Sequence, residues 1–98
     1  MKKEKFFILK ANGYEQVEGY IIDGVGYHKL GSGRWISTDL ETGMFYCIAP
    51  TLKECKATVR TKWDRISTIK KSMKYQEMFG ARIRELAEYK EKHHESNL

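Results

Sequence analysis

The chain has 98 residues, of which 41% are hydrophobic, 12% aromatic and 32% charged. This balance is too apolar for a disordered chain and too polar for a membrane protein. Half of so short a chain would not bury enough apolar surface to form a core, which excludes two domains. We expect a single domain over residues 1–98, with a sheet half over 1–49, a helical half over 51–92 and a flexible tail over 93–98.

The N-terminal residues lack the features of a targeting segment. The apolar run at residues 6–9 ends at Lys10, whereas a secretory signal needs roughly 7–15 apolar residues and a membrane span about 18. Two cysteines, Cys47 and Cys55, are too few for a disulfide framework. The sequence therefore predicts a cytoplasmic protein with reduced cysteines and no membrane partner.

The half before Pro50 is predicted to be an antiparallel sheet. Asp23-Gly24 is a strong signal for a two-residue type I′ hairpin turn, and further glycine-containing turns follow at 31–33 and 39–43. The last apolar segment has apolar residues on both faces, which predicts a central or doubly covered strand. The predicted strands cover residues 6–9, 17–22, 25–30, 34–38 and 44–49.

After Pro50 the apolar pattern becomes helical. Thr51 and Glu54 fit a capping box. We expect Ser67 and Thr68 to restart a second helix, Gly80 to cap or kink a helix, and residues 81–92 to form the last one. Strands followed by helices along the chain predict an α+β fold, with a four- to five-stranded antiparallel meander followed by two or three C-terminal helices packed on one face. The inward stripe of the first helix is Leu52, Cys55, Val59, Trp63 and Ile66.

Sites for metal or catalytic chemistry are not indicated. The candidate ligands His28, Cys47, Cys55, His93 and His94 lack the spacing of a metal site, so no metal or other cofactor is predicted. The glycines at 24–26 and 31–33 lie between strands, whereas a phosphate loop joins a strand to a helix. We predict that the chain is not an enzyme. A small hydrolase using Cys47 or Cys55 is the alternative, although core packing explains both cysteines.

The strongest functional signal is the distribution of charge. Residues 1–50 carry six basic and six acidic side chains, residues 51–84 ten and three, and residues 85–98 two and four, so the net charge of +5 is concentrated in the middle segment. Phosphate backbones are the commonest partner of such a surface, and about five phosphate contacts predict a log–log salt slope near −4.5 on duplex DNA. The predicted binding residues are Lys53, Lys56, Arg60, Lys62, Lys70, Lys71 and Lys74.

Three roles for this basic surface stay open. It binds nucleic acid or a nucleoprotein, it binds an acidic protein surface, or it serves solubility alone. The protein-binding alternative is an inhibitor or adaptor that docks on a host protein such as a defence nuclease, in the manner of an anti-CRISPR protein. An edge strand or the apolar residues of 73–79 offer a route to a homodimer. The sheet residues Tyr14, Tyr20, Tyr27, Trp35 and Tyr46 are candidates for stacking on unpaired bases or for packing beneath the helices.

One stretch resembles a known group of domains. Trp35, Asp39, Thr42 and Gly43 form the pattern W-x3-D-x2-T-G, which is followed by a strand and by T-x2-E at the start of a helix. This pattern resembles small accessory domains of phage and other mobile-element proteins and, more loosely, the arm-binding domains of phage integrases. The resemblance implies a mobile-element origin. In the integrase-type domain the sheet contacts the DNA major groove, whereas the sheet half of this chain carries no net charge.

Overall fold

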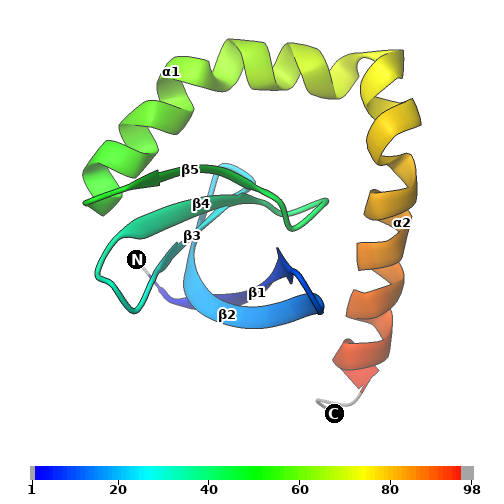
Figure 1. The fold of residues 1–98 in the computed structure, drawn as a ribbon, viewed down its shortest axis with the longest axis horizontal. Coiled ribbons are helices and arrows are strands. Elements are labelled where there is room, and N and C mark those ends of the chain that lie inside the picture. Colours follow the sequence, from blue (N-terminus) through cyan, green and yellow to red (C-terminus); the bar gives the residue numbers. More distant parts are fainter. Residues whose placement is uncertain (1, 96–98) are drawn as a thin grey trace.

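The computed structural model describes the backbone of residues 2–95 and the side chains of residues 2–92 (Figure 1). Neighbouring strands are antiparallel and follow chain order across one sheet, which confirms the predicted meander. Two C-terminal helices follow, so the α+β fold is also confirmed. The elements are β1 (Glu4–Lys10), β2 (Gly13–Ile22), β3 (Val25–Lys29), β4 (Trp35–Asp39), β5 (Phe45–Ala49), α1 (Leu52–Lys71) and α2 (Met73–Glu95).

The predicted hairpin turn between β2 and β3 is confirmed. Ile22 pairs with Val25, and the two residues between them have positive φ angles, 50° at Asp23 and 80° at Gly24. This combination defines a type I′ turn, whose twist matches that of the flanking strands. The hairpin is therefore fixed in register, and it ends close to α1.

β2 begins four residues earlier than predicted and is strongly curved (Figure 1). Its first part pairs with β1 and its last part with β3. A side chain at Gly19 would collide with the carbonyl of Tyr27, so glycine permits the close approach at this point. The curvature folds β1 over one face of β3–β5, where the ring of Phe6 packs edge-on against buried His28 with centroids 5.9 Å apart. The sheet thus encloses a small core of its own.

The opposite face of the sheet is covered by α1. Val25 and Tyr27 of the sheet form one buried cluster with Cys55 and Val59 of α1. Cys55 is fully buried, and its Sγ lies 3.6 Å from Sγ of Cys47. Both cysteines are free. Leu52, Cys55 and Val59 of the apolar stripe predicted for the first helix therefore face the sheet, whereas Trp63 of the same stripe is 37% exposed.

The prediction that residues 44–49 form a central or doubly covered strand is wrong. β5 is the last strand in the sheet order, and only the face carrying Cys47 and Ala49 lies beneath α1. Phe45 and Ile48, which pair with residues on the other face of β4, are 61% and 40% exposed. The apolar residues on that outer face leave an uncovered surface.

The break between the helices falls at Ser72, not at Ser67 and Thr68 as predicted. The Ser72 hydroxyl donates to the carbonyl of Ile69 at 2.7 Å and accepts from the N–H of Tyr75 at 3.1 Å. One serine thus ends α1 and begins α2, and Gly80 lies inside α2 rather than at its end. α2 turns away from α1 and runs beside the sheet (Figure 1).

α2 is held against β1 and β2 mainly by aromatic contacts. The ring of Tyr89 lies 5.2 Å from the rings of Phe7 and Tyr14, and its hydroxyl donates to the carbonyl of Tyr14 at 3.2 Å. The backbone of residues 93–95 continues α2, and residues 96–98 of the predicted tail lie outside the described residues. Neither described helix contains a stretch long and apolar enough to cross a membrane.

Candidate nucleic-acid interface

The orientation of α1 follows from its N-terminal cap and its apolar stripe. The Thr51 hydroxyl accepts from the N–H of Glu54 at 3.1 Å, which fixes where the helix begins. With 3.6 residues per turn, the burial of Cys55 and Val59 determines which residues face solvent. Cations outside this stripe are therefore presented by a helix whose rotation is fixed by the core.

Three of the predicted binding residues lie together on consecutive turns of α1. Lys53, Lys56 and Arg60 are spaced by three and four residues, which places neighbouring side chains on one side of a helix. Together with Leu52 and Ala57 they line a surface hollow of about 420 Å³ that has no acidic side chain in its wall. Among the described side chains, none of the three cations forms an ion pair. Within the described part of the chain, none of the three charges is therefore compensated by a direct ion pair.

A second hollow, of about 400 Å³, adjoins the first between α1 and the β2–β3 hairpin. Lys56 and Arg60 line both hollows. The second hollow adds the ring of Trp63, which is 37% exposed, and the carboxylates of Asp23 and Asp64. Its remaining wall is apolar, from Ile22, Val25, Tyr27 and Val59.

Charged residues of the second hollow affect the pKa of Tyr27 in its wall. Burial raises the pKa of Tyr27 to about 12, and the positive charge of Arg60 opposes that rise while Asp23 adds to it. Arg60 and Asp23 are thus close enough to the buried phenol to affect it. Lys56 and Arg60 thus lie between two hollows, one with a basic wall and one with an aromatic and apolar wall.

The other cations predicted for the interface lie elsewhere. Lys62 follows Arg60 by two residues, about 200° around the helix, and it is exposed. Lys71 is exposed in the last turn of α1, and Lys74 is exposed in the first turn of α2. The structure therefore brings Lys53, Lys56 and Arg60 together but does not add Lys62, Lys71 or Lys74 to them.

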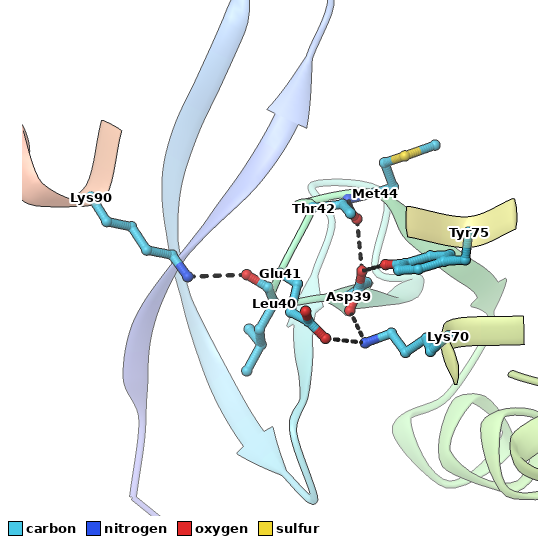
Figure 2. Close-up of polar contacts among 8 residues, drawn as sticks. All are labelled: Asp39, Leu40, Glu41, Thr42, Met44, Lys70, Tyr75 and Lys90. Atoms are coloured by element: carbon cyan, nitrogen blue, oxygen red, sulfur yellow. Dashed lines mark hydrogen bonds and ion pairs between the residues drawn. The ribbon is translucent and has the colours of Figure 1, made fainter. Parts of the chain in front are cut away.

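Lys70 is bonded within the chain (Figure 2). Its Nζ donates to Oδ1 of Asp39 at 2.6 Å and to Oε1 of Glu41 at 2.9 Å. The second oxygen of Asp39 accepts from the hydroxyl of Thr42 at 2.8 Å and from that of Tyr75 at 3.4 Å. Lys70 thus joins the end of α1 to the β4–β5 connection, and its charge is compensated there.

Burial and pairing act against each other in this cluster. Burial alone would raise the pKa of Asp39, but hydrogen bonds from Lys70 and Thr42 hold it below its ordinary value. Burial would likewise lower the pKa of Lys70, and its bonds to Asp39 and Glu41 raise it instead. Both groups are therefore ionised over the whole neutral range.

A signal for the role of Lys70 is present in the sequence. Lys70 follows Cys55 by fifteen residues, Val59 by eleven and Ile66 by four, so it shares the phase of the inward stripe. Its charge alone suggested that Lys70 belongs to the outward-facing cations of the predicted binding surface. Grouping residues by helical phase would have placed it toward the sheet, where an acidic partner is required.

The surroundings of the candidate nucleophiles and metal ligands favour a role in packing. Burial raises the pKa of Cys55 to about 11, which is opposite to the activation of a nucleophile. Burial also lowers the pKa of His28. Within the described part of the chain no three His, Cys, Asp or Glu residues gather as metal ligands, and the side chains of His93 and His94 lie outside it.

The sheet aromatics considered for base stacking are largely engaged in packing. Tyr20 and Trp35 stack on each other with ring centroids 6.1 Å apart. Tyr27 is buried beneath α1, and Tyr14 packs on Tyr89. The aromatic ring that borders the basic surface is Trp63, which the apolar stripe had assigned to the core.

The residues of the W-x3-D-x2-T-G pattern shape the β4–β5 connection. Asp39 and Thr42 belong to the Lys70 cluster, and Gly43 has φ of 77° with its backbone against β1. Glycine is favoured there because a side chain is strained at positive φ. Comparison of the chain with protein-family models, curated proteins and solved structures finds no match.

Proposed function

We propose that this domain binds nucleic acid through Lys53, Lys56 and Arg60 of α1. The observation that carries the proposal is that these three cations line one hollow that has no acidic side chain and form no ion pair among the described residues. A cluster of cations without ion-pair partners attracts phosphate groups and releases counterions when it binds them. The resemblance of residues 35–55 to mobile-element accessory domains implies an origin rather than a mechanism, so the proposal rests on the α1 cations alone.

The test is a binding titration with a labelled 20-nucleotide single strand and its duplex, followed by fluorescence anisotropy at 50 mM salt. The variant Lys53→Gln/Lys56→Gln/Arg60→Gln is expected to bind at least about tenfold more weakly, because three phosphate contacts are removed. Wild-type protein that binds neither oligonucleotide at this salt concentration would contradict the proposal.

A matched control removes the same net charge from other places. Lys3, Lys29 and Lys92 are exposed and form no ion pair among the described residues. The variant Lys3→Gln/Lys29→Gln/Lys92→Gln is expected to keep most of the affinity. Equal losses in the two triple variants would show that overall charge, rather than the α1 surface, attracts the oligonucleotide.

A second candidate function, docking on a protein as an inhibitor or adaptor, is favoured by a different surface. Phe45, Met73 and Met78 are 61%, 81% and 63% exposed. Phe45 also borders a hollow of about 240 Å³ between β5 and the corner of the two helices, together with Ile66, Ile69 and Phe79. Exposed apolar side chains of this size, of which Phe45 lines the hollow, are typical of protein-binding surfaces.

Nuclease treatment separates the two candidates. A complex captured from lysate that survives nuclease, is lost in Met73→Glu/Met78→Glu and is kept in the α1 triple variant would support protein docking. Loss of the captured material on nuclease treatment would support the nucleic-acid function.

A further inference from the structure

The two adjoining hollows on α1 differ in chemistry. The hollow around Lys53, Lys56 and Arg60 is purely basic in its charged groups. The hollow against the β2–β3 hairpin combines Lys56 and Arg60 with two carboxylates, so its ionised side chains balance, and it adds an aromatic ring and apolar walls. A charge-balanced, apolar and aromatic hollow is a poor site for phosphate and a good site for a flat, uncharged group with polar edges.

We infer that the hollow between α1 and the β2–β3 hairpin binds an unpaired nucleobase, so that the domain prefers single strands to duplexes. This inference rests on the proposed function and specifies its ligand. Trp63 supplies the stacking surface: it is 37% exposed and forms no ring pair within the described part of the chain. Stacking on an aromatic side chain requires a base that is not already paired, because a paired base has both faces covered by its neighbours.

The position of the cations supports an arrangement in which the phosphate occupies the basic hollow and the base occupies the aromatic hollow. Lys56 and Arg60 line both of them, so a phosphate held on the basic side lies directly beside the aromatic side. A nucleotide unit has this arrangement, since its phosphate and its base are joined through one sugar. The floor formed by Val25, Tyr27 and Val59 is buried and apolar, which suits the face of a base.

The carboxylates give the hollow a preference among bases. Asp23 in the hairpin turn and Asp64 on α1 both line it, and a carboxylate accepts hydrogen bonds without donating any. Cytosine, adenine and guanine present an exocyclic amino group as donor, whereas thymine and uracil present carbonyl oxygens in its place. The structure therefore points to amino-bearing bases as the preferred occupants.

The experiment uses the intrinsic fluorescence of tryptophan. The chain has two tryptophans, and Trp35 is stacked on Tyr20. The wild-type protein and Trp63→Phe are each titrated with oligo(dC), oligo(dT), the RNA strand oligo(C) and a duplex. Because Trp35 is the only tryptophan left in the variant, the difference between the two proteins measures stacking at Trp63. We expect oligo(dC) to quench the wild-type emission strongly, oligo(dT) less, the duplex little, and none of them to change the emission of Trp63→Phe.

A second variant measures the affinity. Trp63→Leu keeps an apolar side chain at the position and is expected to weaken binding of oligo(dC) about tenfold while leaving duplex binding within about twofold, because only the stacked base loses its partner. Asp64→Asn is the matched polar variant and is expected to reduce the preference of oligo(dC) over oligo(dT). Similar behaviour of oligo(C) and oligo(dC) would show that the base rather than the sugar is recognised.

The outcomes separate this inference from the proposed function. Salt-dependent binding with equal affinity for duplex and single strand, no quenching, and no effect of Trp63→Leu would overturn the base-binding hollow and leave the phosphate-binding surface in place. Absence of binding to every oligonucleotide at 50 mM salt would overturn both. Quenching by single strands that persists in the α1 triple variant would support the base hollow and contradict the role of the three cations.

Discussion

Residues of one chemical type serve different purposes in this domain. Lys70 and Lys56 both lie on α1. The side chain of Lys70 is 23% exposed and bonded to two carboxylates, whereas Lys56 lines both hollows on α1 and forms no ion pair among the described residues. The difference arises from helical phase, since Lys70 shares the stripe of Cys55 and Val59. A lysine in the inward phase must find an acidic partner, because an unpaired buried charge is costly.

The contribution of Lys70 is measurable as stability. Lys70→Met leaves the carboxylate of Asp39, which is 6% exposed, without its cation. We expect the free energy of unfolding, from urea denaturation at pH 7, to fall by about 2–3 kcal/mol, below the range for fully buried pairs because Lys70 is partly exposed. In an Asp39→Asn background the same substitution is expected to have much less effect. An unchanged midpoint in the single variant would show that the cluster does not stabilise the fold.

The same cluster predicts a dependence of stability on pH. The pKa of Asp39 is lowered in the folded protein, so its contribution is present above the ordinary carboxyl pKa and is lost as pH falls through the lowered value. The difference between wild-type protein and Lys70→Met is therefore expected to be full at pH 7 and to shrink below about pH 4. Thermal denaturation across this range measures it, and a constant difference down to pH 3 would exclude Asp39 as the group responsible.

At the scale of elements, local patterns predicted most of what the structure shows. The Asp23-Gly24 turn, the Thr51 cap and the first part of the α1 stripe, at Leu52, Cys55 and Val59, each depend on a few neighbouring residues, and each is confirmed. The length and bend of β2 and the edge position of β5 were not predicted, because they depend on contacts between distant segments. The β2 bend needs the backbone of Tyr27 to approach Gly19, and no local pattern reports that approach.

The helix break illustrates how neighbouring serines are distinguished. Both Ser67 and Ser72 were available to begin a helix, but only Ser72 has an extended backbone, with ψ of 149°, and accepts from the N–H of the residue three positions later. The Ser67 hydroxyl instead donates to the carbonyl of Asp64 within α1. The two serines have the same capping chemistry in the sequence, and the one used is the one whose hydroxyl accepts from the N–H of buried Tyr75.

Substitution of the two serines tests this assignment. Ser72→Ala removes the acceptor for the N–H of Tyr75 and is expected to lower the free energy of unfolding by about 1 kcal/mol, as is usual for loss of an N-cap. Ser67→Ala is the control and is expected to change it by less than about 0.5 kcal/mol, because alanine is favourable inside a helix. Urea denaturation of both variants provides the comparison. A larger loss of stability in Ser67→Ala than in Ser72→Ala would contradict the assignment of the helix break to Ser72.

At the scale of the whole molecule, folding redistributes the charge that the sequence describes. The segment 51–84 carries a net charge of +7, but Lys70 is compensated by Asp39 and Glu41 of the otherwise neutral sheet half. Lys62 lies on another side of α1, and Lys71 and Lys74 lie at the helix corner. The sequence therefore indicated the segment that carries the positive charge of the proposed binding surface. It did not predict its shape, because the wall opposite α1 comes from a hairpin about forty residues earlier in the chain.

This redistribution changes the expected salt dependence of binding. The seven candidate cations predicted about five phosphate contacts, which correspond to a slope near −4.5 when the logarithm of the binding constant for duplex DNA is plotted against that of the salt concentration. The three cations that lie together predict a slope of about −2.7 on a duplex and about −2 on a single strand. Binding constants measured by anisotropy between 25 and 200 mM salt give both slopes. Lys53→Gln alone is expected to reduce the magnitude of each by a little under one, and Lys70→Gln to leave both unchanged in protein shown by circular dichroism to be folded. A duplex slope near −4.5 that falls in Lys71→Gln and Lys74→Gln would instead show that the nucleic acid extends along α1 to the helix corner.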